Sequence, residues 1–296
     1  MSLDYPRITV VTPAYKAARL IEATMKSVLD QNYPNLEYIV LDGAGDHTGE
    51  ILARYDSQLA HWRSAPDHGQ YAAINEGFAR TTGDILCWLN ADDMFHPRSL
   101  FVVASVFARF AEVDWLSSLT PTLWDASGQL AAFTSTPGFS REALLDGLYL
   151  PGTMAKGYWI QQESTFFRRS LWEKAGGKIP DYSLAGDFAL WCEFARHADL
   201  VGLDYPLAGF RLVEGQRSQA VADYMGQGRA ALDALRSDQH WLPGRNQRLR
   251  QSMLAKIPKL RGLLREQAGY RASKIINPDL RQPVIDWQMV DYRFLA

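Results

Sequence analysis

The sequence predicts an α/β fold in which helices cover both faces of a mostly parallel β-sheet. The first third of the chain alternates short apolar segments with segments whose apolar residues recur at helical spacing, which is typical of a three-layer α/β/α arrangement. Polar residues follow the apolar segments directly, as in sheets that bind ligands at the carboxyl ends of their strands. The 296 residues, 47% of them hydrophobic, can bury a substantial core in one large domain or two closely packed ones.

The elements of the first third can be assigned in order. The first helix carries Ile21, Met25 and Val28 on one face and stops at Tyr33-Pro34, because proline cannot continue a helix. In chain order, the predicted elements are a strand at 7–12, a helix at 21–29, a strand at 36–41, a helix at 51–59, a short strand at Trp62, a helix at 69–79 and a strand at 85–89.

The second half of the chain predicts fewer regular elements. Residues 113–163 are expected to form further strands, with a hairpin at Asp125–Gly128 and an irregular stretch at 150–158. A strand at 164–167 leads into a helix that ends at Gly176-Gly177, and another helix is expected at 187–197. Residues 219–296 have helical composition.

Composition excludes several classes of protein. The formal net charge of -2 gives no reason to expect nucleic acid as a partner, which normally requires a strongly basic face. Only Cys87 and Cys192 occur, both in apolar segments, so we expect neither a disulfide framework nor a thiolate zinc site, and a reducing cytoplasm fits best. No signal segment or membrane-spanning stretch is expected, so any membrane contact would be peripheral.

The most informative motif is Asn90-Ala91-Asp92-Asp93, at the end of the apolar run 85–89. Adjacent carboxylates at the carboxyl end of a strand suit a divalent cation held beside a diphosphate. Solvated turn residues or helix caps are the alternative reading of such a pair. The other polar clusters, at Thr12–Tyr15, Asp42-Gly43, Asp67–Gly69 and Gly186-Asp187, favour a nucleotide-diphosphate site when taken together.

These motifs resemble those of family 2 glycosyltransferases. The resemblance rests on five segments and covers residues 1 to about 220: Ile8–Tyr15, Ser27–Pro34, Asp42-Gly43 with Asp46 and Thr48, Asn90–Asp93, and Gly186-Asp187 with Trp191. It implies the GT-A type of fold, a Rossmann-like three-layer α/β/α sandwich. We therefore expect a catalytic domain at 1–218, with a nucleotide-binding half at 1–93 and an acceptor-binding half at 94–218, followed by a mainly helical extension at 219–296.

The resemblance assigns the donor nucleoside to the first two strands. Thr12, Pro13, Ala14 and Tyr15 would line the nucleoside pocket, and Asp42 would bind a uracil or related base. Further nucleotide contacts are expected from Asp67, Gly69, Asn75, Asn90 and Asp92. Asp67 could instead cap the helix that follows it, and Gly69 could be a simple turn glycine.

The resemblance also assigns the ion and the chemistry. Asp93 would coordinate Mn²⁺ or Mg²⁺, with Asp92 helping or holding the ribose, and these two roles could be exchanged. Asn90 stands where relatives commonly carry an acidic residue. Asp187 would be the base that takes the proton of the acceptor hydroxyl, although an aspartate at a helix start is often only a cap.

Four further residues are assigned to the acceptor or diphosphate by the same resemblance: Gln162, Glu163, Trp191 and Arg211. Gln162 and Glu163 could equally lie in a polar loop, and Trp191 could stack on a sugar ring or pack in the core. Arg211 suits a bidentate phosphate contact. Val213 occupies a position where relatives often have histidine.

The resemblance therefore implies a metal-dependent inverting glycosyltransferase that uses a nucleotide-diphosphate sugar, with a UDP-sugar favoured, in bacterial cell-envelope or exopolysaccharide synthesis. Its acceptor would be a saccharide or a lipid-linked saccharide. Residues 245–274 carry nine basic residues against one acidic residue and could contact anionic lipid at the inner face of the membrane, or form a solvated helix. One alternative is a sugar nucleotidyltransferase, but residues 12–19 lack the glycine-rich loop expected of that class. The other alternative is a carbohydrate-binding or nucleotide-binding protein with a decayed site.

Overall fold

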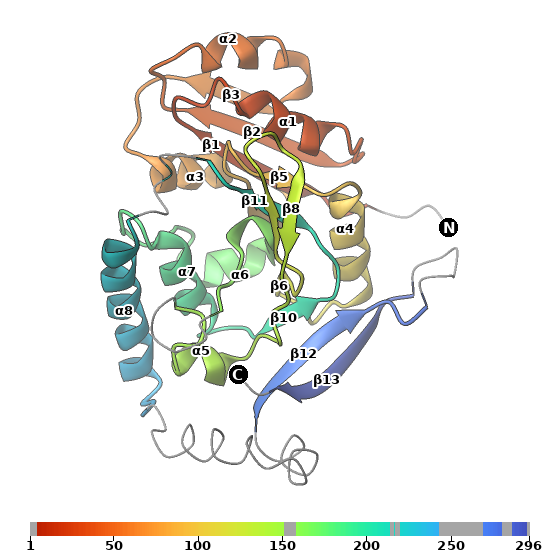
Figure 1. Cartoon of the computed structure of the whole chain (residues 1–296), viewed down its shortest axis with the longest axis vertical. Coiled ribbons are helices and arrows are strands. Elements are labelled where there is room, and N and C mark those ends of the chain that lie inside the picture. The colour runs from red at the N-terminus through yellow and green to blue at the C-terminus, as the bar shows by residue number, and fades with distance from the viewer. Residues whose placement is uncertain are drawn as a thin grey trace.

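The computed structural model describes residues 5–150, 158–213, 216, 220–242, 269–279 and 286–294. Its main element is a nine-stranded sheet with the strand order β13-β12-β10-β6-β9-β4-β1-β2-β3 (Figure 1). The strands are β1 (Ile8–Ala14), β2 (Leu36–Asp42), β3 (His61–Ser64), β4 (Ile85–Trp88), β6 (Trp115–Ser118), β9 (Thr165–Arg168), β10 (Leu200–Leu203), β12 (Tyr270–Ile276) and β13 (Gln288–Phe294).

The nucleotide-binding half expected at 1–93 is the regular part of this sheet. Strands β3, β2, β1 and β4 are parallel neighbours, with Ile8 opposite both Leu36 and Ile85. Their carboxyl ends therefore lie at one edge, as the alternating sequence pattern predicted. Strand β9 runs antiparallel between β4 and β6, so the segment that precedes β9 reaches that same edge.

Helices cover both faces of the sheet, which confirms the predicted three-layer α/β/α architecture. Neighbouring residues of β1 point to opposite faces: Val10 joins the core beneath one helix layer and Val11 joins the core beneath the other. One layer contains α1 (Ile21–Leu29), α2 (Thr48–Ala53) and α4 (Ser99–Arg109). The other layer contains α3 (Gln70–Ala79), α5 (Arg141–Leu145), α6 (Arg169–Lys174), α7 (Gly186–Phe194) and α8 (Val221–Asp238).

A second, four-stranded sheet lies beside the carboxyl edge of β4. Its order is β5-β11-β7-β8, from β5 (Met94–Phe95), β11 (Ala208–Arg211), β7 (Thr122–Trp124) and β8 (Leu130–Phe133). The predicted hairpin at 125–128 connects β7 to β8, and its Gly128 adopts a φ of 83° that glycine tolerates without strain. Because β5 begins directly after Asp93, this sheet places β11 next to the acidic motif.

Three segments differ from the sequence-based expectations. The helix expected at 51–59 is the short α2, followed by a 3₁₀ turn at Asp56–Gln58. Helix α7 ends at Phe194 rather than residue 197. The tail contains the expected helix, α8, but also the strands β12 and β13, which join the main sheet and which helical composition did not predict. The basic residues at 245–268 lie outside the described residues.

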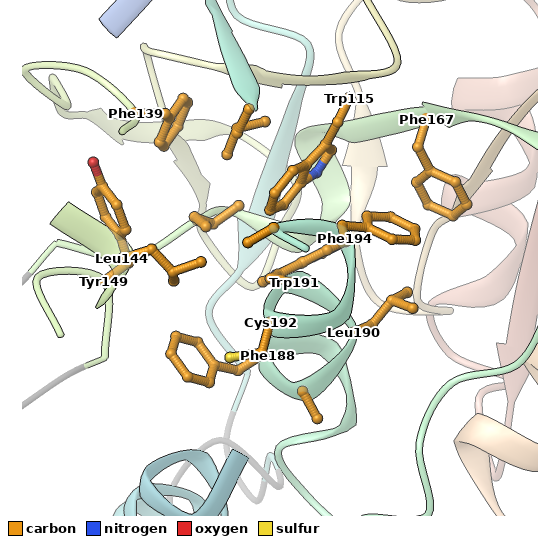
Figure 2. Packing of buried hydrophobic residues seen from close by; sticks show 14 of the residues in the cluster. Trp115, Phe139, Leu144, Tyr149, Phe167, Phe188, Leu190, Trp191, Cys192 and Phe194 are labelled. Carbon is orange, nitrogen blue, oxygen red and sulfur yellow. The ribbon is translucent and has the colours of Figure 1, made fainter. Parts of the chain in front are cut away.

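Helix α7 is fixed in the core by its aromatic side chains. Trp191 is 1% exposed and stacks on Trp88 of β4, with ring centroids 5.5 Å apart and an interplanar angle of 19°. Figure 2 shows Trp191 on the inner side of α7, close to Trp115 and Phe194. Since burial of each such ring stabilises the fold by about 2–3 kcal/mol, the start of α7 is held in place relative to the sheet.

Candidate active site

The acidic motif forms a tight turn after β4 that is anchored from α1. Thr24 is fully buried, and its hydroxyl donates to the carbonyl oxygens of Ala91 at 2.9 Å and Asp93 at 2.8 Å. The backbone N–H of Asp93 also donates to the carbonyl of Asn90 at 3.0 Å. These bonds fix the backbone of the turn, and therefore the direction in which its side chains point.

The two aspartates of the motif have different environments. Asp93 is fully buried, and both of its carboxylate oxygens accept hydrogen bonds: Oδ1 from the N–H of Arg211 at 2.9 Å, and Oδ2 from Nδ2 of Asn90 at 3.2 Å. Asp92 is only partly buried, and its Oδ2 accepts from Nε2 of Gln216 at 2.8 Å. Asp92 is thus the more accessible carboxylate, whereas Asp93 links the turn to β11.

Asn90 joins three segments through its side-chain amide. Its Nδ2 donates to Asp93 and to Oε1 of Gln162 at 3.1 Å, and its Oδ1 accepts from Nε2 of Gln70 at 2.7 Å. Gln162 in turn donates to the carbonyl of Trp88 at 2.7 Å. An aspartate at position 90 could not donate to both oxygen acceptors, so asparagine fits this particular network.

Glu163 adds a third carboxylate to the two aspartates, and it is buried. It lies in the 3₁₀ turn Gln162–Ser164 before β9, is 4% exposed, and its Oε1 has no hydrogen-bond partner within the described residues. Burial, together with the nearby charges of Asp92 and Asp187, raises the pKa of Glu163 to about 7. Burial raises the pKa of Asp93 well above its usual range, and the charges of Glu163 and Asp92 add to this effect.

A divalent cation fits this donor set only if phosphate oxygens of a bound nucleotide, together with water, complete its coordination. Among the described residues, no three His, Cys, Asp or Glu side chains are grouped closely enough to hold an ion by themselves. Mg²⁺ and Mn²⁺ are commonly bound by one or two carboxylates together with phosphate oxygens and water. A positive charge would also relieve the repulsion between Asp92, Asp93 and Glu163, and the unpartnered Oε1 of Glu163 is a free acceptor.

Asp42 has the environment of a ligand-binding carboxylate. It ends β2, is fully buried, and accepts from the hydroxyl of Ser64 through Oδ2 at 2.6 Å. Its Oδ1 has no hydrogen-bond partner in the described part of the chain, and burial raises its pKa. A buried acceptor without a partner costs free energy, which a donor group of a ligand would recover.

The Thr12–Tyr15 segment is only partly available to a ligand. The hydroxyl of Thr12 is fully buried and lies 3.0 Å from that of Tyr38, so this side chain belongs to the sheet interior rather than to a pocket wall. Pro13 and Ala14 are also buried. Tyr15 is 66% exposed, and a methyl group on Gly43 would lie 3.3 Å from its ring. Tyr15 is therefore the accessible aromatic surface beside Asp42.

Asp67 and Gly69 lie near this surface, but Asn75 has another role. Oδ1 of Asp67 accepts the N–H of Gly69 at 2.9 Å and would lie 3.2 Å from a methyl group on Gly43. Asp67 thus forms the turn before α3 and also borders the Asp42 region. The side chain of Asn75 instead accepts the N–H of Ile179 at 2.8 Å, so it holds the segment before α7, and the expected nucleotide contact is not supported.

Asp187 is the carboxylate at the start of α7. Tyr224 donates its hydroxyl hydrogen to Oδ1 of Asp187 at 3.2 Å. Burial raises the pKa of Asp187 to about 6, while the hydrogen bonds from the backbone and from Tyr224 act in the opposite direction. Such a carboxylate is ionised at neutral pH yet more basic than an exposed aspartate, which suits a general base.

Two further expectations change with the structure. Trp191 was assigned to the acceptor or diphosphate, but its ring is enclosed in the core and cannot stack on a sugar (Figure 2). Arg211 is 2% exposed, and its Nε and Nη2 have no partner within the described residues. Its guanidinium lies beneath the β7–β8 hairpin, where a methyl group on Gly128 would be 3.7 Å from Nη2, so a phosphate would need access past this hairpin.

Several residues of the site were missed by the sequence reading because their contacts are distant in sequence. Thr24 and Gln70 act from α1 and α3, and Tyr224 acts from α8, which follows the resembling region. Arg63 donates to the carbonyl of Asp42 at 3.1 Å and to Asp67 at 3.4 Å. No local sequence pattern identifies these residues, because residues of these types are common on surfaces and in helices. Only the fold brings them to the site.

Comparisons with known proteins point to the same family that the sequence motifs resemble. The sequence model described as glycosyl transferase family 2 matches residues 9–116. An uncharacterized glycosyltransferase of Mycobacterium tuberculosis is 30% identical over 190 residues, which cover 62% of this chain and 66% of that protein. The family model, this relative and the α/β architecture together support a family 2 glycosyltransferase with the GT-A type of fold.

Two solved structures share the fold. The Staphylococcus aureus TarS fragment 1–349, in complex with UDP-GlcNAc, has a TM-score of 0.61 and 13% identity, with 84% of this chain and 71% of that chain covered. The mannosyltransferase PcManGT of Pyrobaculum calidifontis, in complex with GDP-Man and Mn²⁺, has a TM-score of 0.52 and 18% identity, with coverage of 87% and 83%. At these identities the likeness establishes the fold alone.

Proposed function

We propose that this protein is a metal-dependent glycosyltransferase that moves a sugar from a nucleotide-diphosphate sugar to an acceptor hydroxyl with inversion. The observation that carries the proposal is the group of carboxylates at the carboxyl edge of the sheet. Burial raises the pKa of Asp93, Glu163 and Asp187 there, and although the guanidinium of Arg211 lies near Asp93 and Asp92, such a concentration of buried acids is typical of a functional site.

Asp92 is the residue best suited to hold the ion, because it is the accessible carboxylate of the motif. The sequence analysis expected Asp93 to coordinate the ion and Asp92 to assist, so the roles of the two residues are exchanged here. Asp93 instead keeps the turn and β11 together through Asn90 and Arg211. A bound Mn²⁺ or Mg²⁺ would stabilise the negative charge that develops on the departing diphosphate.

Asp187 takes the proton from the acceptor hydroxyl as the new glycosidic bond forms. The hydroxyl oxygen attacks the anomeric carbon, the bond to the diphosphate breaks, and the proton passes to a carboxylate oxygen of Asp187. A positioned base of this kind contributes on the order of 10²–10⁴ in rate. Its pKa of about 6 keeps it ionised at neutral pH.

A uridine nucleotide is the favoured donor. The unpartnered Oδ1 of Asp42 would accept the imide N–H of uracil, and the exposed ring of Tyr15 would stack on the base. The TarS structure contains UDP-GlcNAc, whereas PcManGT contains GDP-Man, so both classes of nucleotide occur on this fold. The choice of uridine for this chain rests on Asp42.

The acceptor is proposed to be a saccharide or lipid-linked saccharide of a bacterial envelope or exopolysaccharide. Cytoplasmic action, with peripheral contact at the inner face of the membrane, would suit such an acceptor. None of the helices in the described ranges is long and apolar enough to cross a bilayer. The basic stretch proposed to contact anionic lipid lies mostly outside those ranges, so liposome flotation with and without residues 245–296 is its test.

Hydrolysis and transfer assays test the activity directly. We expect release of the nucleoside diphosphate from UDP-sugars with Mn²⁺, and losses of about 10²-fold or more in Asp187→Asn and Asp92→Ala. Gln239→Ala, an exposed change at the end of α8, is the control and should keep full activity. Rates equal to the buffer blank in the parent protein with a broad donor panel would instead indicate a binding protein with a decayed site.

A further inference from the structure

The start of α7 is held by α8, a helix that follows the region matched by the family model. Tyr224 and Gln227 lie three residues apart, and therefore on one face of α8. Tyr224 donates to the carboxylate of Asp187 at 3.2 Å. Figure 1 shows α8 beside α7, at the margin of the molecule.

Gln227 holds the backbone that leads into Asp187. Its Oε1 accepts the N–H of Leu184 at 2.9 Å and the N–H of Ala185 at 3.2 Å, while its Nε2 donates to the hydroxyl of Ser183 at 2.8 Å. These N–H groups precede the first turn of α7 and would otherwise need water or another acceptor. One side chain of α8 thus fixes three consecutive residues just before the proposed base.

The opposite side of the same turn is held by α3. The hydroxyl of Tyr71 donates to the carbonyl of Leu184 at 2.5 Å and accepts the N–H of Asp187 at 3.4 Å. A methyl group on Gly186 would lie 2.6 Å from the Tyr71 ring, so glycine is required for this close approach. The residues around Asp187 are therefore enclosed between α3 and α8.

Helix α8 is itself firmly attached. Leu232 and Leu235 are buried in the core on the α7 side of the sheet, and a methyl group on Gly228 would lie 2.5 Å from Leu150. At its far end, Arg236 donates to the carbonyl of Leu145 at 2.6 Å, and Asp238 pairs with Arg196 after α7. A helix fixed at both ends can set the position of a carboxylate with which it forms a hydrogen bond.

We infer that α8 positions the proton-accepting carboxylate, with Tyr224 orienting the Asp187 side chain and Gln227 fixing the backbone before it. Both are positioning residues, since neither needs to touch the sugar or the acceptor. The inference rests on the proposed function of Asp187 as base. It adds a role for two residues of α8, which lies outside the region matched by the family model.

The two residues should affect the reaction differently. The ionisable groups that face Asp187 are Tyr71 from α3, Glu163 before β9 and Tyr224 from α8. The hydrogen bond from Tyr224 favours the ionised form of Asp187 and lowers its pKa, against the effect of burial. Gln227 carries no charge and bonds only to groups other than the carboxylate, so it affects geometry and not ionisation.

The test is the pH dependence of kcat/KM for Tyr224→Phe and Gln227→Met, measured on the full chain with UDP-sugar and Mn²⁺. In Tyr224→Phe, the acid limb should move to higher pH by about one unit, which is about tenfold in rate below the limb. In Gln227→Met, the plateau should fall with the limb unchanged. Asp223→Asn, an exposed change next to Tyr224, should alter neither.

The possible outcomes separate this inference from the proposed function. If Asp187→Asn abolishes transfer while Tyr224→Phe and Gln227→Met both keep the parent profile, the role of α8 is wrong and the base stands. If Asp187→Asn transfers at the parent rate, the proposed base is wrong. A melting curve and the KM for the donor are measured for each variant. If unfolding of the protein accounts for the lower activity of both Tyr224→Phe and Gln227→Met, the positioning role is also wrong.

Discussion

Asn90→Asp places a third carboxylate in the motif after β4, and we expect it to destabilise this protein. The amide of Asn90 donates to Asp93 at 3.2 Å and to Gln162 at 3.1 Å, and an aspartate cannot form either bond when ionised. The loss of two hydrogen bonds costs about 1 kcal/mol each. A further carboxylate beside the fully buried Asp93 adds about 2 kcal/mol or more, so the total is about 4 kcal/mol.

The size of this effect should depend on pH. The pKa of the new aspartate would be raised in the folded protein, since it lies next to an acid whose own pKa is already raised by burial. A raised pKa in the folded state means that stability is lost as the pH rises above the unfolded value of about 4. The loss should therefore be small near pH 4 and largest above pH 7.

Thermal unfolding measures this directly. At about 2 °C per kcal/mol for a chain of this size, the Tm of Asn90→Asp should fall by about 8 °C at pH 8. Gln58→Glu introduces the same charge at an exposed position and should change stability by less than about 0.5 kcal/mol. Equal Tm values for Asn90→Asp and the parent at pH 8 would show that Asn90 does not join these segments.

Three other outcomes follow from the same geometry. Asp42→Asn should raise the KM for a UDP-sugar about tenfold or more with little change in kcat, and an unchanged KM would remove Asp42 from base recognition. Trp191→Ala should lower the free energy of unfolding by about 3–5 kcal/mol, and a stable variant with a raised acceptor KM would instead return Trp191 to the acceptor site. Because the pKa of Glu163 is raised to about 7, its ionisation costs stability as the pH rises through 7. Glu163→Gln should therefore melt at a higher temperature than the parent at pH 8 without metal, and equal melting would contradict the buried charge.

The strand ends could be predicted from sequence because local patterns specify them. Short apolar runs predict β1 and β2 as strands buried on both faces, and the parallel arrangement then brings Asp42 and Asp92 to the same edge. The catalytic-domain fold and the order of its main elements follow from such patterns. Family membership was likewise accessible from the same short motifs.

The details of the site could not be predicted because they depend on long-range contacts. Asp93 is fully buried, whereas its neighbour Asp92 is only partly buried. The strand that covers Asp93 is β11, which lies more than a hundred residues later in the chain. Trp191 follows Asp187 by one helical turn, a spacing that fits both a sugar platform and a core residue, and only the stacking on Trp88 decides between them. The strands β12 and β13 are mixed in polarity, and they form by pairing at a sheet edge rather than by local propensity.

The most direct measurement is a crystal structure with a UDP-sugar and Mn²⁺ bound, using the anomalous signal of manganese. The account predicts one ion within about 2.2 Å of a carboxylate oxygen of Asp92 and of the diphosphate, with the base at Asp42 and Asp187 across the anomeric carbon. An ion or nucleotide bound elsewhere, or an Asp187 carboxylate directed away from the sugar, would contradict it.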